Sequence, residues 1–392
     1  MSVGRHLASR LRDVAATMPV VAVTGPRQSG KTTLCRDVFP DKPYVTLEAL
    51  DTRGFASEDP RGFLRQYGDG AIFDEVQRVP ELLSYLQGEV DSRPEPGRFI
   101  LTGSQHFVLT EGLSQSLAGR VGVLYLLPLS LDEIAQFGEV PDDLWEVVVK
   151  GAYPRIFDRQ LEASTWLADY TTTYLQRDVR QVLNVTDLEA FTGFLELAAG
   201  RTACEVNFSA LGADAGVTHP TARSWLSVLE TSFICHRVRA WHKNARKQVV
   251  KAPKLHFIDS GLACYLLGIT RVDQLRRHPL RGAIFESWAA AEILKWRYHR
   301  GLPKRLFHYR EARGPEVDLL VADGERLTAV EVKSGATVAS DFFRHLKVLR
   351  DRVAASSPHL EVDARVLFGG DRGQRRSDAT VIPWHRIQEH AW

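Results

Sequence analysis

Two features that mark other protein classes are missing from this chain: long apolar runs and closely spaced cysteines. The longest apolar segment, residues 121–131, is short and is interrupted by Pro128, so the sequence offers no membrane span. The chain has four cysteines, which lie far apart and form no C-x-x-C pair: Cys35, Cys204, Cys235 and Cys264. This spacing argues against a zinc site and against a disulfide framework.

A charge excess of one sign is missing as well. Lys and Arg number 50 and Asp and Glu 48, which gives a formal net charge of +2, so the chain as a whole is not a generic nucleic-acid binder. Residues 1–14 have no long apolar core and are amphipathic, unlike a signal peptide, and we therefore expect a cytoplasmic protein. The 392 residues, 44% hydrophobic and 25% charged, are typical of two or three globular domains.

The most informative stretch is residues 20–34, VVAVTGPRQSGKTTL. The first four residues of this stretch predict a buried strand, and its last residues are helix-forming. The G-x-x-x-x-G-K-[ST] motif lies between the two, which is the context that a phosphate-binding loop requires. The residues that we expect to contact the nucleotide are Gly25, Pro26, Arg27, Gln28, Ser29, Gly30, Lys31, Thr32 and Thr33.

The residue types of this loop match the chemistry of phosphate binding. Gly25 and Gly30 carry no Cβ, so backbone N–H groups can turn toward phosphate oxygens, and the helix that begins at Lys31 directs its positive end at the same anion. We expect Lys31 to reach the β- and γ-phosphates and the Thr32 hydroxyl to hold Mg²⁺.

A second apolar strand, in residues 70–77 (GAIFDEVQ), ends in two carboxylates. The carboxyl ends of parallel strands border the ligand crevice, so we expect Asp74 to hold Mg²⁺ through water. We expect Glu75 to orient or deprotonate the attacking water as a catalytic residue.

Two further positions are candidates for supporting roles in catalysis. The strand at residues 98–103 ends in small polar residues, of which Thr102 or Ser104 is suited to contact the γ-phosphate or the water. Arg120 has no acidic residue at helical spacing and is a candidate arginine finger, acting in cis or from a neighbouring subunit. The alternative for Arg120 is an ordinary surface arginine.

Strands that alternate with helical stretches over residues 1–140 favour an α/β domain, a parallel sheet with helices on both faces. This arrangement resembles the AAA-type branch of P-loop ATPases. The order GPRQSGKTT, IFDEVQ, LTGSQ, LAGR resembles, more narrowly, the bacterial and archaeal ATPases whose AAA domain is fused to an uncharacterised C-terminal region.

Residues 141–255 predict a helical and winged-helix domain. Aromatic residues at four-residue spacing, Trp166, Tyr170 and Tyr174, indicate a helix face that belongs to the core, and the role of the charged residues beyond it, at positions 177, 178 and 180, is left open. Residues 208–229 show a helix-turn-helix pattern in which Thr218 caps the second helix, and strands follow.

The segment from residue 236 to 256 has no acidic residue. Its basic residues are Arg237, Arg239, Lys243, Arg246, Lys247, Lys251 and Lys254, which predicts a wing that contacts the phosphates of double-stranded DNA. Arg223 is the only basic residue of the expected recognition helix, so sequence-specific readout is doubtful.

Residues 256–392 predict an α/β domain with a second charged constellation. Glu331 and Lys333 are two residues apart and therefore share one face of a strand, Asp318 lies on the preceding hairpin strand, and Glu286 lies among apolar residues of a helix. Two carboxylates and a lysine beside a helical glutamate suit metal-dependent phosphodiester hydrolysis. Asp318 and Glu331 would hold Mg²⁺, and Lys333 would position or activate water or stabilise developing charge.

This constellation resembles the PD-(D/E)xK nuclease superfamily, and the resemblance implies that Glu286 is its first-helix acid and a further metal ligand. With the preceding helices the constellation also resembles the C-terminal region that follows such AAA domains. The resemblance thus extends over nearly the whole chain. It implies ATP as the nucleotide, in line with the absence of an N-K-x-D motif for guanine, and it implies a homo-oligomer.

We therefore expect a Mg²⁺-dependent, AAA-type ATPase whose turnover is coupled to DNA binding or remodelling. One alternative is an ATP-regulated nuclease that uses the C-terminal metal site. Another is a non-catalytic, ATP-binding regulator, such as an antitoxin-like partner of a second protein.

Overall fold

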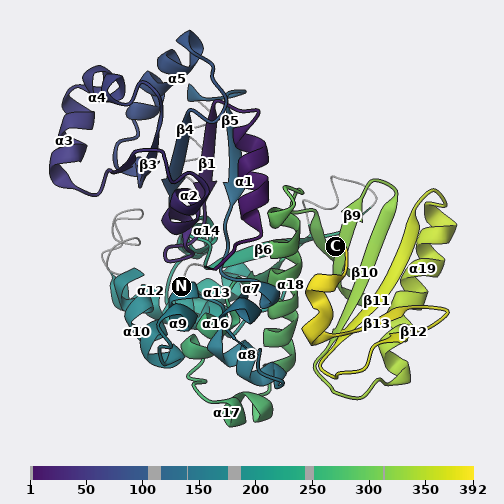
Figure 1. Cartoon of the computed structure of the whole chain (residues 1–392). Coiled ribbons are helices and arrows are strands. Elements are labelled where there is room, and N and C mark those ends of the chain that lie inside the picture. The colour runs from purple at the N-terminus through teal and green to yellow at the C-terminus, as the bar shows by residue number, and fades with distance from the viewer. Residues whose placement is uncertain (1–2, 105–115, 139, 175–186, 243–250, 312–313) are drawn as a thin grey trace.

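The computed structural model describes residues 3–104, 116–138, 140–174, 187–242, 251–311 and 314–392. Within these residues the chain forms a five-stranded sheet near its N-terminus, a helical segment, and an eight-stranded sheet toward its C-terminus (Figure 1). No helix in this described part is long and apolar enough to cross a membrane.

The five-stranded sheet is parallel throughout, with the strand order β2-β3-β4-β1-β5. Its strands are β1 (Val20–Thr24), β2 (Tyr44–Thr46), β3 (Ala71–Asp74), β4 (Phe99–Gly103) and β5 (Val121–Tyr125). Strands β1, β3 and β4 lie in the segments for which the apolar pattern predicts strands. The predicted α/β class with a parallel sheet is therefore confirmed for this part of the chain.

Helices cover both faces of this sheet because its central strands are buried on both sides. Along β1, Val20 and Ala22 contact the core under one group of helices, whereas Val21 and Val23 contact the core under the other. The first group is α3 (Leu50–Glu58), α4 (Pro60–Gln66) and α5 (Leu82–Ser92); the second is α1 (Leu7–Ala15) and α2 (Lys31–Val38).

A helical segment follows, and Trp166 and Tyr170 lie in its core. Both rings are buried and stack on each other, with centroids 5.2 Å apart, which confirms the predicted core stripe for these two residues. The Tyr174 side chain and the charged residues at positions 177, 178 and 180 lie outside the described residues. The helices of this segment are α7 (Leu131–Ile134), α8 (Leu144–Lys150), α9 (Pro154–Asp158), α10 (Ala163–Tyr174), α12 (Leu188–Ala199), α13 (Phe208–Asp214) and α14 (His219–Thr231).

The helix pair α13 and α14 is followed by two antiparallel strands, β6 (Cys235–Ala240) and β7 (Lys254–Phe257). Thr218 caps α14 through its side chain, as its sequence position predicts. Strand β6 also pairs in parallel with β8, so this hairpin forms one edge of the eight-stranded sheet. The predicted domain boundary between residues 255 and 256 consequently falls inside β7.

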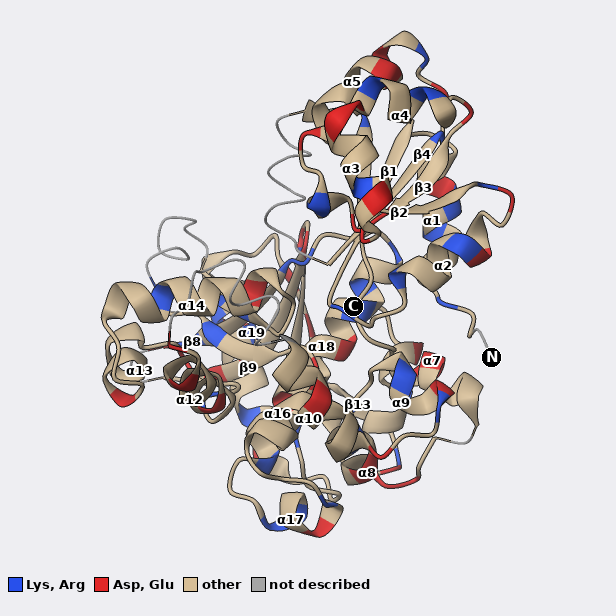
Figure 2. Ribbon diagram, turned by 90° about the vertical axis from the view of Figure 1, so that its left-hand side faces the viewer, with Lys and Arg blue, Asp and Glu red and all other residues tan. Residues whose placement is uncertain are grey.

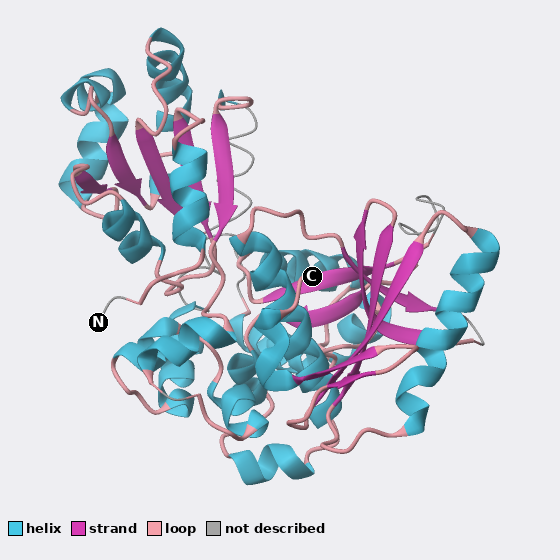
Figure 3. Ribbon diagram, turned by 45° about the vertical axis from the view of Figure 1, so that its right-hand side comes forward, coloured by secondary structure: helices cyan, strands magenta, loops and turns pink. Residues whose placement is uncertain are grey.

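The eight-stranded sheet has the order β12-β13-β11-β10-β9-β8-β6-β7 and is mixed (Figure 3). Its remaining strands are β8 (Leu306–Arg310), β9 (Glu316–Asp323), β10 (Arg326–Lys333), β11 (Glu361–Phe368), β12 (Gln374–Arg375) and β13 (Thr380–Pro383). The apolar α18 (Arg281–His299) packs on one face and the amphipathic α19 (Arg344–Ser356) on the other. Two short helices, α16 (Ser260–Leu266) and α17 (Val272–Arg277), precede α18.

Candidate functional site

The phosphate-binding loop occupies residues 25–30, between β1 and α2. A Cβ on Gly25 would lie 2.0 Å from the carbonyl oxygen of Leu126, so only glycine fits this close approach of two backbone segments. Gly30, the N-cap of α2, has a left-handed φ of 91°, which a residue with a side chain rarely adopts. The two glycines of the motif are thus required by the backbone itself.

The Lys31 side chain folds back across this loop. Its Nζ donates hydrogen bonds to the carbonyl oxygens of Gly25 and Pro26, at 3.1 and 2.7 Å. Burial lowers the pKa of Lys31 to about 8, although the nearby carboxylates of Glu75 and Asp74 favour its charged form. The lysine therefore lies in the loop, close to the two acidic residues at the end of β3.

Oxygen atoms suited to Mg²⁺ come together at Asp74. Thr32 Oγ1 donates to Asp74 Oδ1 at 3.0 Å, and the Tyr44 hydroxyl donates to Asp74 Oδ2 at 2.7 Å. The Thr102 hydroxyl also donates to Asp74. One carboxylate and one hydroxyl at the phosphate loop match the donors that Mg²⁺ takes beside nucleotide phosphates, so Thr32 and Asp74 fit the predicted ion. Tyr44 is a contact that the sequence did not reveal.

Glu75 follows β3 in a left-handed conformation, with φ 58°, and its carboxylate is held by two polar side chains. Gln77 Nε2 donates to Glu75 Oε2 at 2.5 Å and lies 3.2 Å from Ser104 Oγ. Ser104 Oγ is 3.5 Å from the same Glu75 oxygen. The structure thus brings Ser104 next to Glu75, and it adds Gln77 to the residues that orient this carboxylate.

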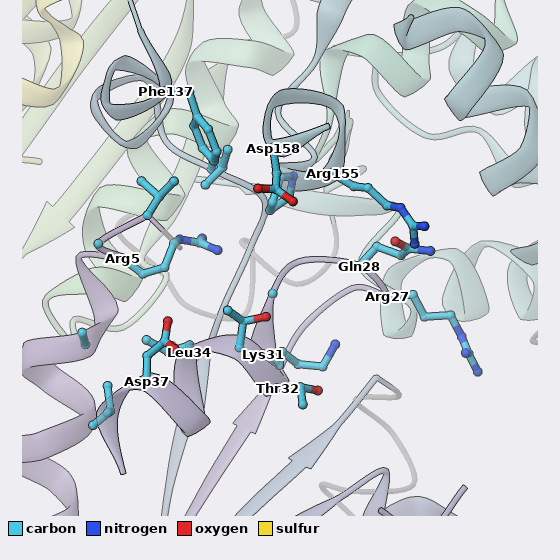
Figure 4. A pocket seen from close by; sticks show the side chains of 18 of the residues that line it. Arg5, Arg27, Gln28, Lys31, Thr32, Leu34, Asp37, Phe137, Arg155 and Asp158 are labelled. Carbon is cyan, nitrogen blue, oxygen red and sulfur yellow. The ribbon is translucent and has the colours of Figure 1, made fainter. Parts of the chain in front are cut away.

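A pocket of about 950 Å³ extends from the phosphate loop to the helical segment (Figure 4). On the side of the helical segment, the pocket is lined by α9, by the residue that follows it and by the end of α10. Arg155 and Asp158 of α9 and the following Arg159 are among the lining residues. The exposed Arg155 guanidinium forms no hydrogen bond or ion pair with any described residue, and in Figure 4 it extends toward Gln28 of the loop. A cation from a different segment therefore faces the phosphate-binding residues within the same chain.

Arg5 supports the loop from the opposite side. Its Nη1 donates to the carbonyl oxygen of Ser29 at 2.7 Å, its Nη2 donates to that of Leu127 at 2.8 Å, and its side chain is only 7% exposed. Glu133 Oε1 lies 3.1 Å from Arg5 Nε. Burial raises the pKa of Glu133, but Arg5 and His299 outweigh it and hold that pKa at about 2. No sequence pattern marks Arg5, because its partners are remote in the chain.

Arg120 lies at the wrong edge of the sheet to act in cis. Strands β1 and β5 pair in register from Val20 with Val121 to Thr24 with Tyr125, so Arg120 precedes β5 at the amino edge. The phosphate loop follows β1 at the carboxyl edge. The Arg120 guanidinium forms an ion pair with Asp91 at the surface. The cis alternative predicted for Arg120 is therefore wrong, and only the action from a neighbouring subunit stays a prediction.

Comparison with known proteins places this site in a family. Residues 17–135 match the family described as AAA domain, residues 141–273 match a domain of unknown function (DUF8612), and residues 281–387 match another (DUF4143). The chain is 30% identical over 338 residues to the uncharacterized protein Rv2008c of Mycobacterium tuberculosis, across 85% of this chain and 74% of the relative. It belongs to this AAA-domain family of P-loop ATPases.

The identity and the coverage are the same for the uncharacterized protein Mb2031c of Mycobacterium bovis. A Walker-type ATPase of Pyrococcus abyssi, PABY2304, is 18% identical and has a TM-score of 0.44, over 66% of this chain and 94% of that one. In this AAA-domain protein the phosphate loop and the acidic end of β3 both lie within the part that matches the AAA domain.

The C-terminal constellation of this AAA-domain protein does come together, but around a lysine. Lys254 Nζ, from β7, lies 3.0 Å from Glu286 Oε1, 2.8 Å from Glu316 Oε1 and 4.0 Å from Asp318 Oδ1. Lys333 Nζ is 2.7 Å from Glu331 Oε1. We call these six residues the C-terminal cluster; they are Lys254, Glu286, Glu316, Asp318, Glu331 and Lys333.

The metal site predicted at Glu286, Asp318 and Glu331 is not formed. Among the described residues, no group of three or more His, Cys, Asp or Glu side chains is arranged to hold a metal ion. Burial and the charge of Asp318 raise the pKa of Glu286 well above its usual range, and the same causes raise that of Glu331 to about 8. The physical reason for the correction is that the Lys254 ammonium already lies between the carboxylates.

The expected basic wing is also weaker than its sequence suggests. Lys254 is 3% exposed and belongs to the C-terminal cluster. Arg237 forms an ion pair with Glu230 at 2.5 Å. Arg239 and Lys251 are exposed, whereas residues 243–250 lie outside the described residues. Figure 2 shows basic and acidic residues interspersed along the ribbons of all parts of the chain.

Proposed function

We propose that this chain is a Mg²⁺-dependent ATPase that binds and hydrolyses ATP and couples turnover to DNA binding or remodelling. The observation that carries the proposal is the convergence of Lys31, the Thr32–Asp74 pair and Glu75 at one edge of the parallel sheet. Lys31 would reach the β- and γ-phosphates, and Glu75 would orient the attacking water. Mg²⁺ held by Thr32 and Asp74 would neutralise charge that develops on the phosphates.

The location of the pocket supports binding of the nucleotide between two segments of one chain. Arg155 faces the loop from α9, so it would contact phosphate oxygens once ATP is seated. An arginine placed at transferring phosphates stabilises charge that grows in the transition state. ATP binding would therefore also draw the helical segment toward the sheet.

A winged-helix interpretation of α13, α14 and the β6–β7 hairpin supports the DNA part of the proposal. The exposed side chains of Arg239 and Lys251 flank residues 243–250, which contain three further basic residues. Such residues contact phosphates regardless of base sequence. Binding would consequently depend on salt concentration more than on DNA sequence.

Assembly into a homo-oligomer is part of the same proposal. Arg120 is 34% exposed and pairs with Asp91 at the protein surface, where a neighbouring subunit has access to it. If Asp91 releases it at a subunit interface, Arg120 would supply an arginine finger to the neighbour.

The deciding experiment is steady-state ATP hydrolysis by the wild type and by Glu75→Gln, with and without double-stranded DNA. We expect DNA to stimulate the wild type and Glu75→Gln to lower kcat by at least about 100-fold. Glu81→Gln, at an exposed glutamate next to α5, is the matched control and should leave kcat unchanged.

The other outcomes separate the alternatives. A rate of ATP hydrolysis that DNA does not change would overturn the proposed coupling to DNA and favour a protein partner. An intact protein with no turnover, alone or with DNA, would overturn the ATPase and favour a regulator or antitoxin-like protein that uses ATP as a structural switch.

A further inference from the structure

Lys254 lies where three structural elements of the C-terminal half meet. It extends from β7, and its Nζ contacts Glu286 on α18 and Glu316 at the start of β9, at 3.0 and 2.8 Å. Its side chain is 3% exposed. A buried ammonium is stable only when carboxylates surround it, and here carboxylates of two other elements do so.

Several of the oxygens that a metal ion would use are already paired with other groups of the chain. Asp318 Oδ2 accepts a hydrogen bond from the backbone N–H of Val332 at 2.8 Å, and its Oδ1 lies 4.0 Å from Lys254 Nζ. Lys333 Nζ donates a hydrogen bond to Glu331 Oε1 at 2.7 Å. Glu331 Oε2 is buried without a hydrogen-bond partner among the described residues. It is a single oxygen, because the neighbouring Glu286 Oε1 and Glu331 Oε1 are already paired with lysines.

The position and the charge of Lys254 therefore both oppose binding of a divalent metal ion between Glu286 and Asp318. A divalent ion bound by Glu286 and Asp318 would lie within a few ångströms of the Lys254 ammonium, and two positive charges at such a distance repel strongly away from water. The Lys254 side chain is buried, and it extends from β7, which pairs with β6 at the edge of the sheet.

We propose that Lys254 is the resident cation of the C-terminal cluster. It takes the place of a divalent metal, so this part of the chain is a structural unit and not a metal-dependent nuclease. Because β7 pairs with β6, the same ammonium fastens the β6–β7 hairpin to α18 and β9. The inference concerns the C-terminal cluster alone and holds whether or not ATP turnover responds to DNA.

Manganese binding by the full-length, nucleotide-free chain tests the proposal. Bound Mn²⁺ is counted by electron paramagnetic resonance in the wild type, in Lys254→Gln and in Lys254→Gln combined with Asp318→Asn. We expect Lys254→Gln to gain one Mn²⁺ site at least tenfold tighter than any in the wild type, and the double variant to lose it. Lys251→Gln, at an exposed lysine three residues away, is the control and should gain none.

A second comparison needs no change at Lys254. The wild type and Asp318→Asn should bind the same number of Mn²⁺ ions, and neither should cut plasmid DNA with Mn²⁺ present. A Mn²⁺ ion that disappears with Asp318→Asn, or cleavage that disappears with Glu331→Gln, would overturn the proposal. A folded Lys254→Gln variant that gains no site would overturn it as well.

Discussion

Arg5 donates a hydrogen bond of 2.7 Å from Nη1 to the backbone carbonyl oxygen of Ser29, inside the phosphate-binding loop. Its Nη2 donates to the carbonyl oxygen of Leu127, on the segment that leads from the parallel sheet to α7. One guanidinium therefore joins the loop to the beginning of the helical segment. The conformation of the loop depends on a residue that precedes α1.

The substitution Arg5→Ala tests this dependence. It leaves the buried carboxylate of Glu133 without its nearest cation, and removing one partner of a buried ion pair costs about 3 kcal/mol of stability. We expect a lower midpoint of thermal unfolding and weaker binding of a fluorescent ATP analogue. Arg61→Ala, at an exposed position on α4, should change neither. Unaltered ATP binding by Arg5→Ala would show that the loop does not need this contact.

Arg155 is expected to act on the nucleotide in its own chain. Removing its guanidinium in Arg155→Ala should lower kcat for ATP hydrolysis on the order of 100-fold, because a donor aimed at developing phosphate charge is lost. Steady-state kinetics measures this change. Arg61→Ala, at an exposed position on α4 that does not line the pocket, is the control. Equal losses in both variants would point to a general electrostatic effect instead.

Local sequence signals predicted the elements that depend on them. The apolar run at Val20–Val23 and the cap at Thr218 each act within a few residues of chain, and both are present in the structure. The motif of the phosphate loop likewise predicted where Thr32 and Asp74 meet. The strand and the cap can be read from the sequence because their causes lie within a few residues. Thr32 and Asp74 are 42 residues apart, and they meet because the loop after β1 and the end of β3 lie at the same edge of one parallel sheet.

Contacts between remote segments were not predictable in the same way. Lys254 looked like part of a basic wing because its neighbours in sequence are basic, yet the packing of β7 against α18 brings it to Glu286. Tyr44 and Arg155 carry no pattern of their own, and they become part of the site only when the folded chain places them there. A charge pattern along the chain does not show which charges the fold will bury.

Gln77 is expected to position Glu75. Without the hydrogen bond from Gln77 Nε2, the Glu75 carboxylate can turn away from the attacking water, so Gln77→Ala should lower kcat about tenfold. KM for ATP should stay unchanged, because neither side chain is expected to hold the phosphates. Gln66→Ala, at an exposed position on α4, is the control. A raised KM with unchanged kcat would contradict a positioning role.

His299 gives the protein a dependence of stability on pH. Both of its ring nitrogens are buried without a hydrogen-bond partner among the described residues. Burial lowers the pKa of His299 from 6.5 to about 4 in the folded chain. Between these pH values the unfolded chain binds more protons, so the free energy of unfolding falls as the pH drops from 6.5 to 4.

Substitution of His299 by glutamine isolates this contribution. The lowered pKa of His299 corresponds to about 3 kcal/mol of free energy of unfolding. The wild type should lose this contribution between pH 6.5 and 4, and His299→Gln should lack it. The pKa of Glu133 is lowered to about 2, so its contribution to stability is complete above pH 4.5 and is lost between pH 4.5 and 2. This range lies below the range in which His299 acts. Thermal unfolding at half-unit pH steps measures both, with His359→Gln as the exposed control. Parallel curves for the wild type and His299→Gln would show that His299 does not contribute to this pH dependence.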